Sequence, residues 1–310
     1  MISVIVPVFN EEKNILPLFE RIENSLNKTK CTYEIIYIND GSRDNTFSTI
    51  KNLATKYDFV KYINFSRNFG HQIAVSAGLD LCIGSEAVII DADGQDPPEL
   101  IPSMFDKLNE GFEIVYARRN KRKGESGFKI FTAKVFYRIL SRLTTIDIPL
   151  DTGDFRIIKR KVIDQIKNMP EKQKFLRGQM AWLGFRQTSI EYDRNERLSG
   201  KTNYTIRKML RLATDGITSF SNFPLRLATI SGFLCAFAGF LLILYTLYSR
   251  YILKDYEKGW SSLMITIVFL GGIQLIGIGI IGEYISRIYD NIRNRPLYIV
   301  DETNIKKTEK

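Results

Sequence analysis

Three acidic residues follow an apolar segment in the first third of the chain, at a spacing that suits a divalent cation. Residues 88–90 are apolar, Asp91, Asp93 and Asp96 follow, and Pro97-Pro98 precede the next helical pattern. Two carboxylates two residues apart at a strand end are ligands that Mg²⁺ or Mn²⁺ prefers, with a diphosphate and water completing the coordination. The alternative is a turn in which these side chains cap the next helix.

Polar residues follow three other apolar segments in the same way. Strands are predicted at 2–9, 33–39, 60–65 and 86–91, alternating with helices at 11–27, 44–57, 70–83 and 98–109. This alternation predicts an α/β fold with a mostly parallel sheet, which binds ligands at the carboxyl ends of its strands. The polar groups at those ends are Asn10-Glu11-Glu12, Asn39-Asp40-Gly41-Ser42, Ser66-Arg67-Asn68 and Asp91-Ala92-Asp93.

Basic residues further along the chain are candidates for binding phosphate, because a guanidinium donates paired hydrogen bonds to phosphate oxygens. The candidates are Arg119, Arg122, Arg138, Arg197 and Lys201. The first two follow a predicted strand at 113–117, and the last two precede a helical pattern at 204–220. Each residue taken alone could equally be a solvated surface charge or a contact with anionic lipid.

Two long apolar segments near the C-terminus carry no charged residue. They run from Leu227 to Ser249 and from Ser261 to Gly282, and each is about 20 residues long, enough to cross the hydrocarbon core of a bilayer. A short charged connector separates them, so the sequence predicts a transmembrane hairpin over 227–286. Two buried helices of a soluble protein are the alternative. Glycines in the second segment permit close helix packing and a homo-oligomer.

A hairpin places residues 1–226 and the tail 287–310 on the same side of the membrane. Arg287, Arg293 and Arg295 lie in that tail, and the preference of basic residues for the inner side predicts that both parts are cytoplasmic. The N-terminus begins with a strand pattern rather than a secretory signal. From about Asp301 the tail is expected to be disordered.

The formal net charge of +10 is compatible with nucleic acid, anionic lipid or phosphorylated ligands. Much of the excess lies close to the apolar segments and is interleaved with aromatic residues, which favours a lipid surface over nucleic acid. Amphipathic helical patterns at 128–143 and 204–220 fit helices that lie in the membrane interface, although ordinary surface helices would show the same pattern.

Several motifs together resemble family 2 glycosyltransferases, which have the Rossmann-like GT-A fold. They are Val6-Pro7-Val8-Phe9-Asn10-Glu11-Glu12, Asn39-Asp40-Gly41-Ser42-Arg43-Asp44-Asn45-Thr46, Asp91-Ala92-Asp93 and Gly153-Asp154-Phe155-Arg156. Within that family the chain looks like the polyprenyl-phosphate glycosyltransferases, such as bacterial undecaprenyl-phosphate glucosyltransferases and dolichol-phosphate mannose synthases. The resemblance covers nearly the whole chain, including the hairpin.

The resemblance implies a role for individual residues. For the nucleotide base and ribose it implies a pocket lined by Pro7, Asn10, Glu11 and Asp40. For the metal, Mg²⁺ or Mn²⁺, and the diphosphate it implies Asp91 and Asp93, with Gln95 nearby. Asp154 would lie near the acceptor and, with Asp93, act in catalysis. Two structural alternatives remain: Asp40 as the cap of a helix near Asp44, and Asp154 as the ion-pair partner of Arg156.

The implied reaction is an inverting transfer of a sugar, from UDP-glucose or a related UDP-hexose, to polyprenyl (undecaprenyl) phosphate at a bacterial inner membrane. A processive polysaccharide synthase and a non-catalytic nucleotide-binding scaffold are the alternatives. Processive synthases typically carry a Gln-x-x-Arg-Trp motif. The segment of this chain that comes nearest to it, Gln179-Met180-Ala181-Trp182, lacks the Arg. His71, the only histidine, is expected near the donor site without a catalytic role.

Overall fold

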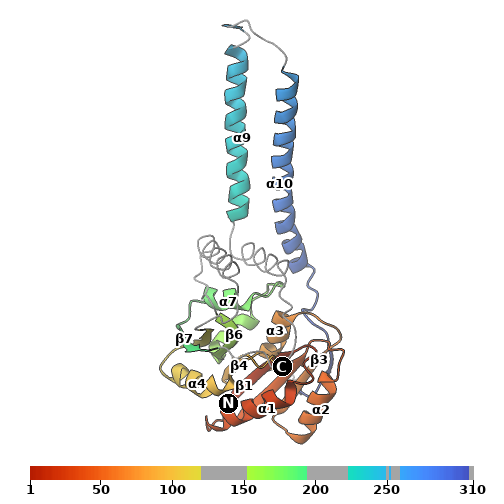
Figure 1. The fold of residues 1–310 in the computed structure, drawn as a ribbon, viewed down its shortest axis with the longest axis vertical. Coiled ribbons are helices and arrows are strands. Elements are labelled where there is room, and N and C mark those ends of the chain that lie inside the picture. Colours follow the sequence, from red (N-terminus) through yellow and green to blue (C-terminus); the bar gives the residue numbers. More distant parts are fainter. Residues whose placement is uncertain (120–151, 194–222, 249–250, 253–258, 307–310) are drawn as a thin grey trace.

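The computed structural model describes residues 1–119, 152–193, 223–248, 251–252 and 259–306 (Figure 1). Its first strands and helices alternate as predicted. The strands are β1 (Ile2–Val8), β2 (Tyr33–Asn39), β3 (Val60–Phe65) and β4 (Glu86–Ile89). The helices between and after them are α1 (Ile15–Asn27), α2 (Thr46–Lys56), α3 (His71–Leu81), a short 3₁₀ turn η1 (Pro98–Leu100) and α4 (Ile101–Asn109).

The second part of the body adds strands that run in both directions. Its elements are β5 (Ile114–Arg119), β6 (Thr152–Lys159), α6 (Arg160–Lys167), α7 (Leu176–Trp182) and β7 (Gln187–Tyr192). The sheet order is β7-β5-β6-β4-β1-β2-β3-β8. Strands β1 to β4 pair in parallel, whereas β6 is antiparallel to both β4 and β5. The strand order reverses direction beside β1, and such a reversal opens a ligand-binding crevice at the strand ends.

Helices cover both faces of this sheet, which explains why its central strands are apolar on both sides. Alternate residues of β1 point to opposite faces. Val4 and Val6 pack with Phe19 of α1 and with the apolar sides of α2 and α4. Ile5 packs on the other face, against α3, α6 and α7. All seven residues of β1 are buried. The predicted α/β fold is therefore confirmed, with its core in two layers.

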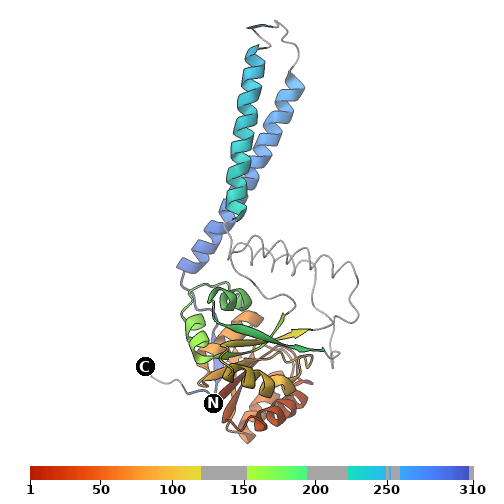
Figure 2. The same ribbon diagram turned by 90° about the vertical axis from the view of Figure 1, so that its left-hand side faces the viewer.

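Two long helices, α9 (Phe223–Tyr248) and α10 (Trp260–Ile292), project side by side from the body (Figures 1 and 2). Both are long and apolar enough to cross a membrane. Their apolar side chains point outward; Phe233 and Leu275, for example, are 73% and 71% exposed. This exposure contradicts the alternative of two buried helices of a soluble protein. Helix α10 also continues past the predicted end at Gly282, through a charged last part.

The prediction of a disordered tail from Asp301 is wrong. Residues Val300–Thr303 form β8, which pairs antiparallel with β3 at the edge of the sheet. The tail thus returns to the body after α10 and runs along it (Figure 2). A four-residue strand has no stability of its own, so local composition does not reveal it; the unpaired edge of β3 supplies its hydrogen bonds.

The two amphipathic patterns, at 128–143 and 204–220, lie outside the described residues. The same is true of Arg122, Arg138, Arg197 and Lys201. For Arg119 the structure describes the backbone at the end of β5, and the side chain lies outside the description.

Candidate functional site

The pairing of β4 with β6 brings two acidic residues together at the strand ends. In this antiparallel pair Ile89 lies opposite Arg156. Two steps forward along β4 correspond to two steps back along β6, so Asp91 comes to lie opposite Asp154. A carboxylate from the motif after β4 and one from the Gly-Asp-Phe-Arg motif therefore share one site, although 62 residues separate them in the sequence.

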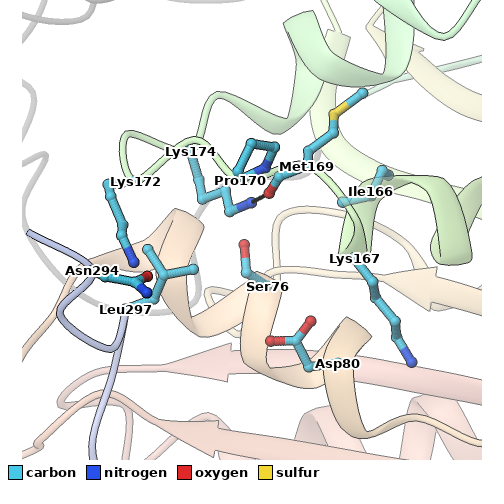
Figure 3. Close-up of a pocket in the computed structure, with 10 residues that line it drawn as sticks. All are labelled: Ser76, Asp80, Ile166, Lys167, Met169, Pro170, Lys172, Lys174, Asn294 and Leu297. Carbon is cyan, nitrogen blue, oxygen red and sulfur yellow. Dashed lines mark hydrogen bonds between the residues drawn. The ribbon is translucent and has the colours of Figure 1, made fainter. Parts of the chain in front are cut away.

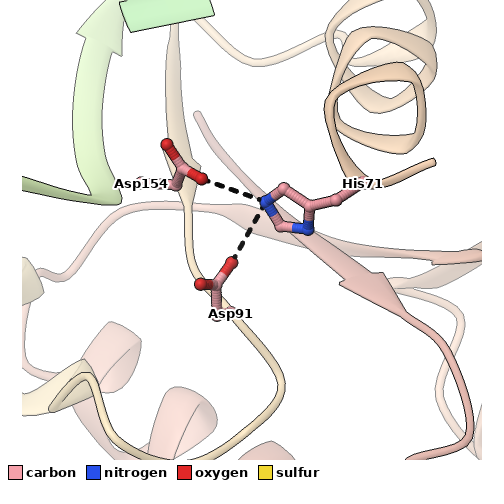
Figure 4. Close-up of side chains that lie close together, drawn as sticks. All are labelled: His71, Asp91 and Asp154. Carbon is pink, nitrogen blue, oxygen red and sulfur yellow. Dashed lines mark hydrogen bonds and ion pairs between the residues drawn. The ribbon is translucent and has the colours of Figure 1, made fainter. Parts of the chain in front are cut away.

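His71 lies between these two carboxylates at the start of α3 (Figure 4). Its Nε2 is 3.2 Å from Oδ2 of Asp154 and 3.4 Å from Oδ1 of Asp91. The location near the strand ends agrees with the prediction from the sequence, but the contact with both acids was not predicted. His71 joins α3 to the two strands that carry the acids.

Asp154 is surrounded by donors. Arg177, at the start of α7, places its Nε 3.0 Å from Oδ1 of Asp154. Gln72 donates from its side-chain amide to Oδ2 at 3.3 Å. The predicted partner Arg156 is more distant, with Nη2 3.8 Å from Oδ1, and it donates hydrogen bonds to the backbone carbonyls of Gly153 and Asp154. Of the two arginines, Arg177 is therefore the closer partner of Asp154.

The surroundings shift the pKa values of these groups in opposite directions. Burial raises the pKa of Asp91 to about 7, against the attraction of His71. Burial acts in the same sense on Asp154, but Arg177 and His71 outweigh it and hold the pKa of Asp154 well below its ordinary value. Burial lowers the pKa of His71, yet the two acids outweigh it and raise this pKa to about 9. At neutral pH Asp154 is an anion and His71 is a cation.

The cluster of His71, Asp91 and Asp154 fits a divalent cation. Ligand atoms of the three side chains lie within 4.8 Å of one another. Oδ1 of Asp91 is shielded from solvent and accepts no hydrogen bond from the residues that the structure describes, and a bound cation would satisfy this buried oxygen. Carboxylate oxygens suit Mg²⁺ or Mn²⁺. His71 is a ligand only in its neutral form, so its proton would have to leave first.

The other predicted metal ligand, Asp93, does not belong to this cluster of three. Its Oδ1 accepts a hydrogen bond of 3.1 Å from the backbone N–H of Gln95, within the turn that follows β4. Gln95 is largely buried. Asp96 is fully buried and accepts a hydrogen bond from the hydroxyl of Tyr192, at the end of β7. The turn is thus fixed from both sides.

The residues predicted for the nucleotide pocket lie together at the ends of β1 and β2. Pro7 is buried in β1. Asn10 donates from its backbone N–H to the Ser42 hydroxyl at 2.9 Å, and its side-chain oxygen accepts from the backbone N–H of Arg43 at 2.8 Å. Glu11 donates from its backbone N–H to the hydroxyl of Thr46 at 2.9 Å. These bonds join the loop after β1 to Thr46 at the start of α2 and to residues 39–45, here named the donor loop after the role that the motifs predict for it.

Asp40 holds the donor loop against the loop that follows β3. Its carboxylate accepts hydrogen bonds from the backbone N–H groups of Phe69 at 2.6 Å and Gly70 at 3.0 Å, and its side chain is buried. The alternative role as a helix cap is wrong. Asp44, whose carboxylate accepts from the backbone N–H of Thr46 at 3.1 Å, does that at the start of α2.

Gly41 is required where these two loops meet. Its φ is +68°, and a Cβ would lie 2.6 Å from backbone atoms of Arg67 and Asn68. Gly41→Ala is expected to lower the free energy of unfolding by about 1–3 kcal/mol. The measurement is thermal unfolding in detergent. Gly184→Ala is the control, because Gly184 has a φ of +69° and, among the described residues, no atom lies within 4 Å of the added Cβ. If both variants lost the same free energy of unfolding, the close approach of Gly41 to the backbone of Arg67 and Asn68 would be unimportant for stability.

Comparison with known proteins identifies the class to which this fold and site belong. Residues 3–167 match glycosyl transferase family 2, and residues 223–288 match the GtrB C-terminal hairpin. The chain belongs to glycosyl transferase family 2. It is a membrane-associated glycosyltransferase with a GT-A domain, as the motifs predicted.

Two relatives align over nearly the whole chain. The uncharacterized glycosyltransferase YkcC of Bacillus subtilis (strain 168) is 50% identical over 301 residues, which are 97% of this chain and 93% of that one. The bactoprenol glucosyl transferase of Shigella phage SfII is 40% identical over 303 residues, 98% of both chains. Among solved structures, glucosyl-3-phosphoglycerate synthase from Mycobacterium tuberculosis with Mn²⁺, UDP-glucose and phosphoglyceric acid aligns over 70% of this chain and 77% of that one, with 18% identity and a TM-score of 0.46.

Two residues of the site were missed in the sequence. Arg177 lies two residues before Gln179, the first residue of the Gln-Met-Ala-Trp segment. Gln72 follows His71 on the first turn of α3 and contacts Asp154 from there. No local pattern marks either residue, because both contacts depend on how α3 and α7 pack around the start of β6.

Proposed function

We propose that this enzyme transfers glucose from UDP-glucose to polyprenyl phosphate at the cytoplasmic face of a bacterial inner membrane. The observation that carries the proposal is the alignment of a bactoprenol glucosyl transferase over 98% of both chains. That alignment includes both the GT-A domain and the hairpin. In this proposal residues 1–226 form the cytoplasmic catalytic domain, 227–286 cross the membrane twice, and 287–310 are a cytoplasmic tail.

The donor is proposed to lie across the ends of β1, β2 and β4. Pro7, Asn10 and Glu11 would line one side of the nucleotide pocket, while Asp40 keeps the donor loop in place. Asp91 would hold Mg²⁺ or Mn²⁺ together with other carboxylates of the site, Asp93 or Asp154. Such a cation supplies positive charge that stabilises the departing diphosphate. Gln95 would approach the diphosphate from the turn after β4.

The acceptor needs orientation more than it needs a base. A phosphate monoester has its second pKa near 6, so its oxygen is already an anion at neutral pH. The reaction forms a bond between this oxygen and the anomeric carbon, and it breaks the bond to the diphosphate oxygen on the opposite face. Asp154 stays ionised, and we assign it the role of holding Arg177 and His71 where they orient these anions. Arg119, Arg122, Arg138, Arg197 and Lys201 are proposed to add phosphate contacts.

The test is transfer of label from a panel of UDP- and GDP-sugars to solvent-extractable lipid, with purified protein, undecaprenyl phosphate and Mn²⁺ or Mg²⁺. Label from UDP-glucose alone, with one sugar per lipid, is the expected result. Repeated addition of sugars to one lipid would indicate a processive synthase. UDP binding without transfer from any donor would favour a non-catalytic scaffold.

Removal of the metal is expected to stop the transfer. Dialysis against EDTA should reduce the rate by at least about 100-fold, because the charge on the departing diphosphate is then uncompensated. Added Mn²⁺ or Mg²⁺ should restore the rate, and the order of effectiveness identifies the preferred ion. A rate unaffected by chelation, with no metal detected in the protein, would contradict the assignment of Asp91 as a metal ligand.

A further inference from the structure

The tail after α10 is attached to the body along its whole described length. Lys172 donates from its ammonium group to the backbone carbonyl of Arg295 at 2.7 Å. Tyr298 stacks on Phe65 of β3, with ring centroids 5.1 Å apart, and its hydroxyl donates to Asp80 of α3 at 3.1 Å. These contacts fix the segment that connects the membrane hairpin to β8.

A cavity of about 210 Å³ lies where this segment meets α3 and the loop between α6 and α7 (Figure 3). Three lysines line it, but two of them use their ammonium groups on backbone carbonyls. Lys172 bonds Arg295, and Lys174 bonds Met169 at 2.8 Å. The cavity is therefore part of the junction that holds the tail.

Strand β8 and the residue after it, Asn304, make two separate sets of side-chain contacts with the body. One set is purely structural. The side-chain oxygen of Asn304 accepts from the backbone N–H of Tyr62 at 2.8 Å, and its amide donates to the carbonyl of Val60 at 3.1 Å. Glu302 accepts from the hydroxyl of Tyr62 at 2.7 Å and pairs with Lys51. The β3 residues in this set, Val60 and Tyr62, lie in the first half of that strand, away from its carboxyl end.

The other set leads to the donor loop through a chain of hydrogen bonds. The carboxylate of Asp301 accepts from the side-chain amide of Asn64 at 3.1 Å. The side-chain oxygen of Asn64 accepts from the amide of Asn39 at 2.7 Å. The side-chain oxygen of Asn39 accepts from the backbone N–H of Ser42 at 3.3 Å. Because an amide flip at any step would leave the next group unsatisfied, Asp301 fixes the orientation of both asparagines.

We infer that Asp301 is a positioning residue for the nucleotide donor, and that the tail of the membrane anchor completes the donor pocket through Asn64 and Asn39. The buried asparagines, 9% and 2% exposed, transmit the orientation that Asp301 sets. The donor loop that they support also bonds Asn10 through the Ser42 hydroxyl. The substrate-binding part of the inference rests on the proposed function; the support of the loop does not.

The test compares two single variants of the full-length protein in lipid nanodiscs. Asp301→Ala removes the first bond of the chain, whereas Asn304→Ala removes two bonds between tail and body and leaves the chain intact. Hydrogen–deuterium exchange of residues 40–46 is expected to become faster by about threefold or more in Asp301→Ala only, because a typical net hydrogen bond is lost. Asp301→Asn should restore slow exchange, since its amide oxygen still accepts from Asn64.

UDP binding, measured by calorimetry on the same samples, is expected to weaken by about threefold in Asp301→Ala and to be unchanged in Asn304→Ala. Unchanged exchange of residues 40–46 in Asp301→Ala would overturn the inference. Equal changes in exchange and in UDP affinity in both variants would also overturn it, since the tail would then stabilise the body without positioning the donor loop. If the unaltered protein binds no UDP, the proposed function fails while the exchange result still decides the role of Asp301.

Discussion

Asp91→Asn is expected to lower the rate of sugar transfer by about 1,000-fold, because loss of metal stabilisation costs about 4 kcal/mol in the transition state. The amide keeps the size of the side chain but loses the charge that would hold a cation. Initial rates at saturating donor and acceptor measure the effect, and titration with Mn²⁺ should not rescue it. Asp58→Asn, at an exposed position of the same domain, is the matched control and should keep the full rate.

The same variant should not be less stable in the absence of metal. Burial raises the pKa of Asp91 to about 7, so the ionised form is disfavoured in the folded state. A carboxyl whose folded pKa lies above its unfolded value reduces stability as pH rises from about 4 to about 7, and this reduction persists above pH 7. In EDTA at pH 8, Asp91→Asn should therefore melt at the same temperature as the unaltered protein or higher. A lower melting temperature would indicate a structural role.

Asp154→Asn is expected to lower kcat by about 100-fold while the dissociation constant for UDP stays within about twofold, because misorientation of reacting groups has costs of this size. The amide retains a hydrogen bond to Arg177 or Gln72 but removes the charge that holds Arg177 and His71 together. Rates with UDP-glucose and calorimetry with UDP separate the two effects.

The assignment of Asp154 as an orienting anion also predicts the pH profile. Its pKa is held well below the ordinary value, so it keeps its charge throughout the range in which the enzyme is stable. The profile of kcat should show no limb that belongs to Asp154. An acidic limb above pH 5 that disappears in Asp154→Asn would instead identify this residue as a general base, and would contradict the orienting role.

The sequence predicted the parts of the fold that depend on local pattern. Strands at 33–39 and 60–65 have the predicted bounds, because apolar segments bounded by polar turns determine a buried parallel strand. The resemblance implied a place for Asp91 at the metal and diphosphate and a place for Asp154 near the acceptor. Their distance from each other depends on the register of β4 with β6, which local pattern does not contain.

Contacts between elements that are distant in the sequence could not be predicted from local pattern. His71 and Arg177 are ordinary helix residues by pattern, and only the packing of α3 and α7 brings them to Asp154. The same holds for the tail. Residues Val300–Thr303 are too few to form a strand by themselves, and pairing with the free edge of β3 stabilises them as a strand. Both cases concern long-range partners, whose identity is set by tertiary structure.

The most direct test of the proposed sugar transfer compares two acceptors that differ only in the phosphate group. Purified protein in vesicles is supplied with radiolabelled UDP-glucose and either undecaprenyl phosphate or undecaprenol, and the lipid product is analysed by mass spectrometry. We expect a single hexose on undecaprenyl phosphate and no product from undecaprenol, because the phosphate oxygen is the nucleophile in the proposed reaction. Equal glucosylation of undecaprenol, or no labelled lipid from either acceptor, would contradict it.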